Sequence, residues 1–337
     1  MTLNSKTRLD RYLAGETVDR RPNLTIIGSV VTRYTGIDIE TYCKDPHRMA
    51  QSAIECARDC RLDFVQIASD LVRAAEAFGS KIHYFPDKLP SVAAPALDDI
   101  TEVGKLHPVK VRDVRRLYDL VDGTAYAMEH CDDIHTMTLI TGPATVAGNT
   151  RGIQDFLVDA FEEEDAVAEL LDLATEAALD LIRELKAVGA SYLYVADPVA
   201  SLFSPDAYRD LVLPRHKKIY NEMEKAGICG RLHMCGDTRK ILPYSSTCGA
   251  KILDIDHAVP FAEALRSVEG RVLLNGNIDP VADVFSCDPA HTKAAMLARA
   301  DEIGRARALF MPGCELPTLT PLENVKAIAD ALDEIGG

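Results

Sequence analysis

The sequence predicts an α/β protein that folds as a single (βα)8 barrel of the TIM type. Short runs of β-forming residues alternate with longer segments whose apolar residues recur at i, i+3, i+4 and i+7, a pattern typical of parallel βαβ units. Eight such runs occur, which is the number of strands in this barrel. An open doubly wound sheet is the alternative, but no GxGxxG motif follows any of the eight runs.

The expected strands and helices alternate along most of the chain. Helical periodicity is clear over residues 165–189 and again over 204–227, where Ser204 is the expected N-cap. The eight expected strands cover residues 23–31, 63–69, 135–141, 191–197, 230–236, 251–257, 271–277 and 308–314.

We expect residues 1–337 to form one domain, because no low-complexity linker or break in composition divides them. The first 20 or so residues are predicted to form a helical extension that covers the bottom or side of the barrel. The stretch from about 80 to 134 interrupts the alternation with "KIHYFPDKLPSV" and a charged segment. It is therefore predicted to be an insertion with a hairpin, placed between the second and third strands.

Composition excludes several classes of partner. The formal net charge is −15, and nucleic acids and anionic membranes carry charge of the same sign. The longest apolar runs are well short of the ~18 residues that cross a membrane, and the polar N-terminal residues contain no apolar signal segment. We expect a soluble cytoplasmic protein without nucleic-acid or membrane partners, and the sequence leaves a homo-oligomer open.

The nine cysteines indicate reduced thiols rather than a disulfide framework. Their number is odd, their spacing is irregular, and the chain is long and has no expected export signal. Clustered cysteine and histidine in such a chain are more typical of a metal site than of disulfides.

Chemistry in a TIM barrel takes place where the carboxyl ends of the strands gather. The expected strand ends carry a set of polar and metal-binding side chains, namely Asp70, Asp197, His233, Cys235, Asp256, His257, Asn275, Asn277 and Cys314.

Three of these residues predict a metal centre. His233 and Cys235 are two apart on a strand, so their side chains point to the same side. Cys314 ends the eighth strand, which faces the fifth across the mouth of a closed barrel. Three ligands with an open fourth position are typical of catalytic zinc, and coordination there would deprotonate a substrate thiol. Spacing alone leaves a second interpretation open, in which the three are ordinary packing residues.

Three longer motifs resemble the uroporphyrinogen decarboxylase superfamily: "RLHMCGDTRKIL", "LNGNIDP" and "MPGCELPTLTPLENVKAI". Within it they are most similar to the branch of zinc-dependent methylcobamide:coenzyme M methyltransferases, and the resemblance extends over nearly the whole chain. It implies a TIM barrel and implies that His233, Cys235 and Cys314 bind Zn2+. It also implies methyl transfer between a methyl-corrinoid and a small thiol such as coenzyme M. No DxHxxG corrinoid-binding signature occurs here, so the corrinoid is expected on a partner corrinoid protein.

The resemblance also separates this branch from the decarboxylases, which carry an RQAGR motif and a Gly-His-Gly motif at the eighth strand. The corresponding segments here are "VVTRYTG", where only Arg33 is comparable, and "PGCELP". A cofactor-free uroporphyrinogen decarboxylase is nevertheless the alternative function, and a non-catalytic binding barrel is a third. The Gly-Asp-Thr after Cys235 argues against a cobalamin-independent methionine synthase.

Two aspartates are candidate catalytic residues. Asp70 matches a position that is a catalytic aspartate in the decarboxylases, although it could equally cap the helix that follows. Asp197 is a candidate second carboxylate of the pocket or, alternatively, a turn residue before Pro198.

Four further residues are candidates for binding substrate. Asp256 or His257 could also serve as a further metal ligand or support one, whereas Asn275 and Asn277 would donate hydrogen bonds or simply form a turn. Glu315, directly after Cys314, is predicted to point away from the metal.

Overall fold

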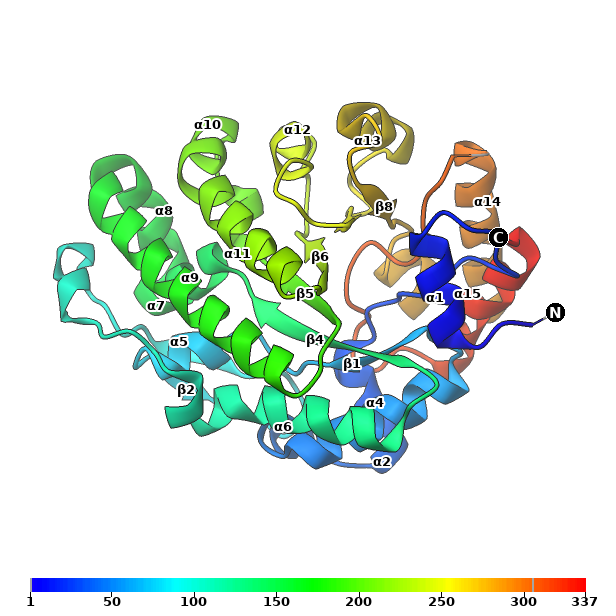
Figure 1. Ribbon diagram of the computed structural model, residues 1–337, viewed down its shortest axis with the longest axis horizontal. Helices are drawn as coiled ribbons and strands as arrows, with labels where there is room; N and C mark the ends of the chain where they lie inside the picture. Colours follow the sequence, from blue (N-terminus) through cyan, green and yellow to red (C-terminus); the bar gives the residue numbers. More distant parts are fainter. Residues whose placement is uncertain (1, 305) are drawn as a thin grey trace.

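The structure is a computed structural model that describes residues 2–304 and 306–337. It confirms the α/β class and a TIM-barrel-like architecture, in which a parallel sheet curves inside a layer of helices (Figure 1). Among the described residues no helix has the length and apolarity to cross a membrane. The sheet has the order β1-β4-β5-β6-β7-β8, with strands β1 (Phe64–Ile67), β4 (His135–Thr141), β5 (Tyr192–Ala196), β6 (Cys229–His233), β7 (Ile252–Asp254) and β8 (Leu273–Asn275).

Six of the eight expected strands pair in this sheet, whereas the first and the last expected strands are not continuous members of it. The last, 308–314, follows β8 through two isolated parallel bridges, Asn275 to Leu309 and Ile278 to Pro312. The barrel is therefore not closed by strand pairing.

Backbone N–H groups of the first expected strand, 23–31, donate to side chains where a strand would donate to backbone, although the carbonyls of Asn23 and Ile26 accept backbone N–H groups. The N–H of Asn23 donates to Asp63 Oδ2 at 2.7 Å, and the N–H of Ile27 donates to Gln66 Oε1 at 3.0 Å. The 3-10 helix η1 (Gly28–Val31) then ends the segment. The prediction of a strand from this β-rich run is therefore not confirmed, because polar side chains take backbone donors that a ladder needs.

Helices follow the strands as predicted. The expected helix 165–189 is α9 (Glu164–Ala187), and Ser204 is the predicted N-cap, accepting the Ala207 N–H at 3.2 Å. The expected helix 204–227 is divided by the π-helical turn η5 (Tyr208–Val212), just before Pro214, whose missing N–H disturbs the regular ladder.

The helices are α1 (Ser5–Leu13), α2 (Thr32–Thr35), α3 (Ile39–Lys44), α4 (Pro46–Asp59), α5 (Arg73–Ala77), α6 (Arg115–His130), α7 (Pro143–Arg151), α8 (Ile153–Glu162), α9, α10 (Pro205–Ala207), α11 (Leu213–Lys225), α12 (Leu242–Ser245), α13 (Phe261–Val268), α14 (Pro289–Ile303) and α15 (Leu322–Ile335).

Alternation along each strand divides the core into two parts. In β5, Tyr192, Tyr194 and Ala196 belong to a small cluster inside the sheet, whereas Leu193 and Val195 belong to the large cluster between sheet and helices. Every second side chain of a strand therefore points into the barrel, and the same rule directs polar residues at the strand ends into its mouth.

The segment 80–134 contains both a hairpin and a helix of the outer layer. Strands β2 (Lys81–His83) and β3 (Ser91–Ala94) form the antiparallel hairpin, and 3-10 helices η2 (Ile100–Lys105) and η3 (Val111–Asp113) follow. Helix α6 then packs against α4 and β4, as the crossover helix between β1 and β4 must.

Helix α1 lies across the amino ends of the strands. Its Asp10 accepts hydrogen bonds from His135 at the start of β4 (2.8 Å) and from Tyr192 at the start of β5 (2.6 Å), while the Tyr12 hydroxyl donates to the Ala308 carbonyl at 2.7 Å. These contacts attach the N-terminal extension to the bottom of the barrel.

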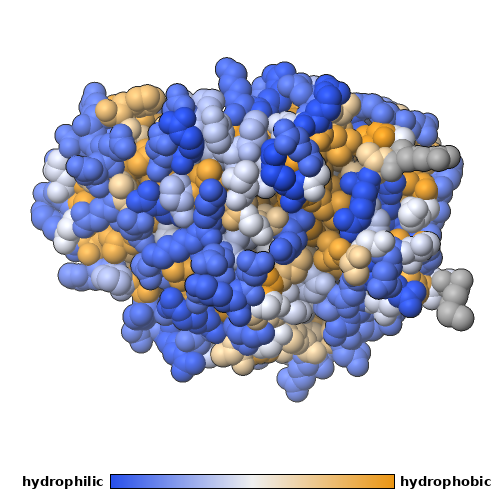
Figure 2. Space-filling model, turned by 45° about the horizontal axis from the view of Figure 1, so that its top comes forward, coloured by the Kyte–Doolittle hydropathy of each residue, from blue (hydrophilic) through white to orange (hydrophobic). Residues whose placement is uncertain are grey.

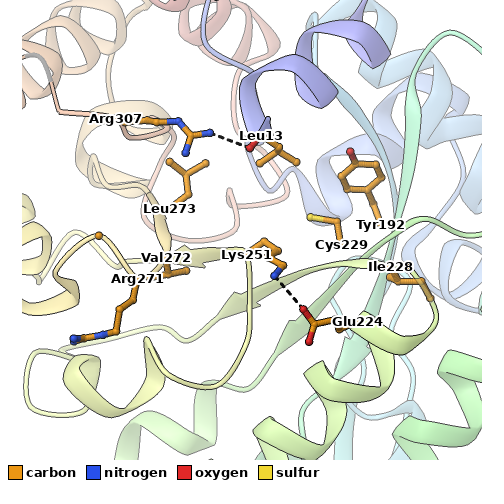
Figure 3. A pocket seen from close by; sticks show the side chains of 12 residues that line it. Leu13, Tyr192, Glu224, Ile228, Cys229, Lys251, Arg271, Val272, Leu273 and Arg307 are labelled. Carbon is orange, nitrogen blue, oxygen red and sulfur yellow. Dashed lines mark hydrogen bonds and ion pairs between the residues drawn. The ribbon is translucent and has the colours of Figure 1, made fainter. Parts of the chain in front are cut away.

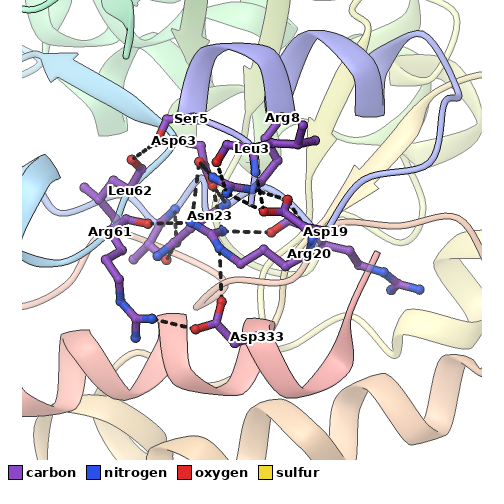
Figure 4. Close-up of polar contacts among 12 residues, drawn as sticks. Leu3, Ser5, Arg8, Asp19, Arg20, Asn23, Arg61, Leu62, Asp63 and Asp333 are labelled. Atoms are coloured by element: carbon purple, nitrogen blue, oxygen red, sulfur yellow. Dashed lines mark hydrogen bonds and ion pairs between the residues drawn. The ribbon is translucent and has the colours of Figure 1, made fainter. Parts of the chain in front are cut away.

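A buried ion-pair cluster strengthens this attachment (Figure 4). The carboxylate of Asp63, which is fully buried before β1, accepts hydrogen bonds from Arg8 at 2.6 Å and Arg20 at 2.7 Å. Arg8 also pairs with Asp19 at 2.8 Å. Burying a carboxylate requires such compensation, so the cluster holds the extension in one position.

A cavity of about 660 Å³ opens at the amino ends of the strands (Figure 3). Tyr192, Cys229 and Leu273, which begin β5, β6 and β8, line it together with Lys251 and Arg307. The surface in Figure 2 is covered mainly by hydrophilic side chains, with hydrophobic ones visible between them.

Candidate metal centre

His233, Cys235 and Cys314 lie together at the carboxyl ends of the strands. His233 is the last residue of β6, and Cys235 follows two residues later. His233 Nε2 lies 3.1 Å from Cys235 Sγ and 3.7 Å from Cys314 Sγ, and the two sulfurs are 3.1 Å apart. Their three ligand atoms form a group that could hold a metal ion.

The donor set fits zinc in kind and in spacing. Tetrahedral zinc with Zn–S bonds of about 2.3 Å and Zn–N bonds of about 2.0–2.1 Å would separate two sulfurs by about 3.8 Å and nitrogen from sulfur by about 3.5 Å. The observed separations differ from these values by less than about 1 Å, so small side-chain rotations would accommodate the ion. One imidazole with two thiolates also favours zinc over magnesium or calcium.

Asp254 holds the histidine in position, and sequence reasoning missed it. The Nδ1–H of His233 donates to Asp254 Oδ2 at 2.9 Å, which turns Nε2 toward the cysteines. Asp254 is fully buried and also pairs with Arg231 at 2.8 Å, while Asn275 Nδ2 donates to its other oxygen at 2.8 Å. The register of β6 and β7 could have identified Asp254. Leu232 pairs with Leu253, so the next residues on the two strands, His233 and Asp254, lie side by side.

The contact between the two cysteines moves their pKa values in opposite directions. The hydrogen bond from the Cys235 thiol, with the charge of His233, lowers the pKa of Cys314 to about 5 despite burial. The same hydrogen bond and burial raise the pKa of Cys235. Burial disfavours the imidazolium, but hydrogen bonds to Asp254 and Cys314 outweigh it and raise the pKa of His233 to about 9.

The centre opens into a cavity of about 720 Å³ at the carboxyl ends of the strands. Its walls are mainly apolar and include Leu71, Val72, Leu89, Val92, Leu139, Ile153, Val199 and Leu202. The hairpin β2–β3 contributes Leu89 and Val92, so the segment that interrupts the barrel alternation forms one wall of the cavity.

Glu315, which was predicted to point away from the metal, lines the same cavity as the three candidate ligands. Its Oε1 accepts the Ser29 N–H at 3.3 Å, and a Cβ atom added to Gly28 would lie 1.7 Å from Oε1. Gly28 is therefore needed for the approach of this carboxyl group. Burial and the charge of Cys314 raise the pKa of Glu315 to about 7.

Asp70 lines the cavity but is engaged by cations on its far side. Arg116 contacts Asp70 Oδ2 at 2.5 Å, Arg73 lies 3.7 Å from it, and Ser69 Oγ donates to it at 2.5 Å. Its Oδ1 accepts the Val72 N–H at 3.1 Å, so it also caps the turn that leads into α5. Burial opposes ionisation, but these cations outweigh it and lower the pKa of Asp70.

Asp197 lies outside the cavity lining, in a fully buried position. It accepts hydrogen bonds from the Ala144 N–H at 3.2 Å and from the Thr145 N–H and hydroxyl, each at 2.7 Å. Its Oδ2 also lies 2.9 Å from His216 Nε2. The contacts place Asp197 at the first turn of α7.

The four residues proposed to bind substrate make contacts within the protein. Asp256 Oδ2 accepts the Gly236 N–H at 2.9 Å, which supports the loop after Cys235. His257 is half-exposed and lies 2.9 Å from Asp256. Asn277 donates to the carbonyls of Asp256 and Val259, and Asn275 donates to Asp254 as described above. None of the four lines the cavity described here.

Comparison with known proteins places these features in a family context. The sequence profile described as "Uroporphyrinogen decarboxylase (URO-D)" matches residues 4–335. A methylcobamide:CoM methyltransferase of Methanosarcina barkeri is 27% identical over 98% of this chain and 97% of its own. A uroporphyrinogen decarboxylase of Nocardia farcinica is 26% identical over 82% of this chain and 78% of its own. The solved structure of a methyltransferase from Methanosarcina mazei superposes with a TM-score of 0.88, at 26% identity over 98% of this chain and 99% of its own.

Proposed function

The chain belongs to the uroporphyrinogen decarboxylase (URO-D) family, and we propose that within this family it is a zinc-dependent methyltransferase. Its reaction would move a methyl group between a methyl-corrinoid, carried on a partner protein, and a small thiol. Coenzyme M appears in the name of the Methanosarcina barkeri relative and is one such thiol. Transfer in the opposite direction, from a methylated substrate to the corrinoid, would use the same site.

One observation carries the proposal: an imidazole and two thiols converge at the edge of a cavity where a substrate could reach them. Their atoms lie within 4.8 Å of one another, and all three residues line the cavity. A structural zinc site usually has four protein ligands and is closed, whereas three ligands beside a cavity leave one position for substrate.

Zinc bound there would hold the acceptor thiol as a thiolate at neutral pH. The role of the chain is to position and to shield. Asp254 fixes the ring of His233, and Arg231 and Asn275 in turn fix Asp254. The apolar walls would shield the acceptor sulfur from water and so leave it available for in-line attack on a methyl carbon.

The mouth of the cavity supplies a contact area for a protein that presents a corrinoid ring. Ile153 and Leu202 line the cavity and are 38% and 58% exposed. Val158 and Phe161 follow on α8, and Phe161 is 80% exposed. Ile153 and Leu202 thus put exposed apolar surface at the cavity itself, and such surface is typical of a site that another molecule covers.

Uroporphyrinogen decarboxylation is the second candidate, and the position of Asp70 in the cavity favours it. The arginine that partly matches the decarboxylase motif, Arg33, is exposed and donates to the Thr320 carbonyl. It does not line the cavity, where it would be needed to hold substrate carboxylates. A porphyrinogen decarboxylation assay tests this candidate directly.

Metal content provides the decisive test. Protein purified without chelator is expected to contain about one zinc per chain by plasma mass spectrometry, and Cys235→Ser is expected to lose it. Cys229→Ser is the matched control, since Cys229 begins the same strand, is also partly buried and lies at the opposite end of the barrel. Wild-type protein without zinc, or equal zinc in both variants, would overturn the proposal.

A further inference from the structure

The electrostatic character of the cavity restricts the substrate that it can accept. Two carboxyl groups line it, those of Asp70 and Glu315, beside the thiols of Cys235 and Cys314. Among the described residues that line it there is no lysine or arginine. The lining therefore presents no fixed positive charge to a substrate, apart from His233 at the centre itself, and the charge of Asp70 is already compensated by Arg116 and Arg73.

The cations nearest to Asp70 are already engaged. Arg116 pairs with Asp70 at 2.5 Å and with Glu76 at 2.9 Å. Arg73 is buried and donates to the Cys43 carbonyl at 2.9 Å and to Ser69 Oγ at 2.6 Å. Turning either guanidinium into the cavity would leave buried acceptors unpaired, which is costly.

Several neutral donors of the lining are also committed, although no acceptor is assigned to the hydroxyls of Tyr194 and Ser91. Gln66 Nε2 donates to the Tyr194 hydroxyl at 2.6 Å, and Thr145 Oγ1 donates to Asp197 at 2.7 Å. Asn149 Nδ2 donates to the Leu71 carbonyl at 3.3 Å, and Ser201 Oγ to the Pro198 carbonyl at 2.8 Å. An anionic group bound here would exchange its hydration for at most these two hydroxyls and no cationic partner, which is a poor exchange for a full charge.

The rest of the wall is aliphatic. Leu71, Val72 and Val92 on one side and Leu139, Val199 and Leu202 on the other are suited to apolar groups. A cavity of about 720 Å³ also has room for far more than the few atoms of the smallest thiols.

We infer that the thiol acceptor of this enzyme carries no negative charge beyond its sulfur and presents an uncharged or cationic body to an aliphatic, carboxyl-lined cavity. The inference rests on the proposed zinc-dependent function. It separates the acceptor from thiols with a sulfonate or carboxylate tail, so coenzyme M, 2-mercaptoethanesulfonate, would be a poor one.

The test compares thiols of equal size that differ in charge. We would measure dissociation constants by calorimetry on zinc-loaded protein for 3-mercaptopropionamide against 3-mercaptopropionate, and for 2-mercaptoethanesulfonamide against 2-mercaptoethanesulfonate. The uncharged member of each pair is expected to bind at least about tenfold more tightly, because the charged tail loses hydration without a partner. Binding of all four thiols is expected to disappear in Cys235→Ser, and this loss would show that the thiols bind at the metal centre.

A cation introduced into the wall should reverse part of the preference. Gly236 directly follows Cys235, and a Cβ atom added to Gly236 would lie 3.7 Å from Ser201 Oγ. Ser201 is therefore close to the centre, and Ser201→Lys would place an ammonium group in the cavity beside it. In this variant the ratio of the dissociation constant of the charged thiol to that of the uncharged thiol is expected to fall about two- to fivefold, which is the effect of one solvent-screened charge pair. Ser201→Met has a similar length without the charge and is expected to leave the ratio unchanged.

The outcomes separate the two proposals. Zinc-dependent binding in which the charged thiols equal or exceed the uncharged ones would overturn the inference and leave the methyltransferase function standing. Zinc-loaded protein that binds none of the four thiols would overturn both.

Discussion

The imidazole Nδ1 of His233 lies 2.9 Å from a carboxylate oxygen of Asp254, on the strand next to its own. This contact links the candidate metal centre to the polar interior of the barrel, because Asp254 also pairs with the buried Arg231. The imidazole orientation therefore depends on residues below the site as well as on the ligands.

Replacing Asp254 with asparagine should weaken zinc binding about 10- to 100-fold, the usual effect of removing a carboxylate that orients a histidine ligand. Competition with a chromogenic chelator measures the affinity, and circular dichroism checks folding. Asp256→Asn is the control, since Asp256 lies two residues further on and contacts the Gly236 N–H instead of His233. Equal affinities for both variants would show that Asp254 does not orient the ligand.

Asp197 should prove to be a stabilising residue with no direct part in the chemistry. Asp197→Ala leaves His216, two backbone N–H groups and the Thr145 hydroxyl without their acceptor, and about 2–4 kcal/mol of unfolding free energy should be lost. Urea denaturation measures the loss, and zinc content should stay at the wild-type level. A variant of normal stability without methyl transfer to the thiol would instead assign Asp197 to catalysis.

Asp63 should matter more to stability than any exposed member of the same cluster. Asp63→Asn removes the charge that two buried arginines face, and a cost of about 3–5 kcal/mol is expected. Asp333→Asn, whose carboxylate is half-exposed while pairing with Arg20 and Arg61, should cost less than about 1 kcal/mol. The two variants can be compared in one urea series, and similar costs would contradict the role given to burial.

His135 should make the protein more sensitive to acid. Burial lowers the pKa of His135 below its ordinary value of 6.5, although Asp10 opposes the shift. The unfolded chain therefore takes up a proton near pH 6.5 while the folded chain does so only at lower pH, and stability falls as pH drops through this range. His135→Gln keeps a donor for Asp10 and removes this titration.

The stability difference, wild type minus His135→Gln, is accordingly expected to decrease between pH 7.5 and pH 5.5. Urea midpoints at three pH values in this range provide the measurement. A constant difference would show that folding does not change the pKa of His135, and a difference that grows toward acid pH would show that folding raises it; either result would contradict the prediction.

Much of the architecture could be predicted from the sequence because hydrophobic periodicity is a local property. Helix α9 and strand β4 begin and end close to the residues predicted for them. His233 and Cys235 were expected on one side of a strand because side chains alternate with period two, and their ligand atoms lie 3.1 Å apart.

Hydrophobic periodicity could not predict the hydrogen bonding of the first expected strand, 23–31. The segment has the β-forming residues expected of a strand, yet Asp63 and Gln66 accept N–H groups that a ladder would use. These acceptors lie about 40 residues along the chain, and periodicity contains no information on such distant side chains.

The sequence by itself determined the α/β alternation, the position of polar residues at strand ends and the ligand types of the candidate centre. Only the tertiary structure decided which of those residues meet. The register between β6 and β7 places Asp254 beside His233. The absence of a side chain at Gly28 leaves room for the carboxyl group of Glu315 at the cavity. Hydrogen bonds to the first turn of α7 hold Asp197 outside the cavity lining. The physical reason is that covalent geometry sets which way each side chain points, whereas the neighbour it meets depends on how distant strands pack.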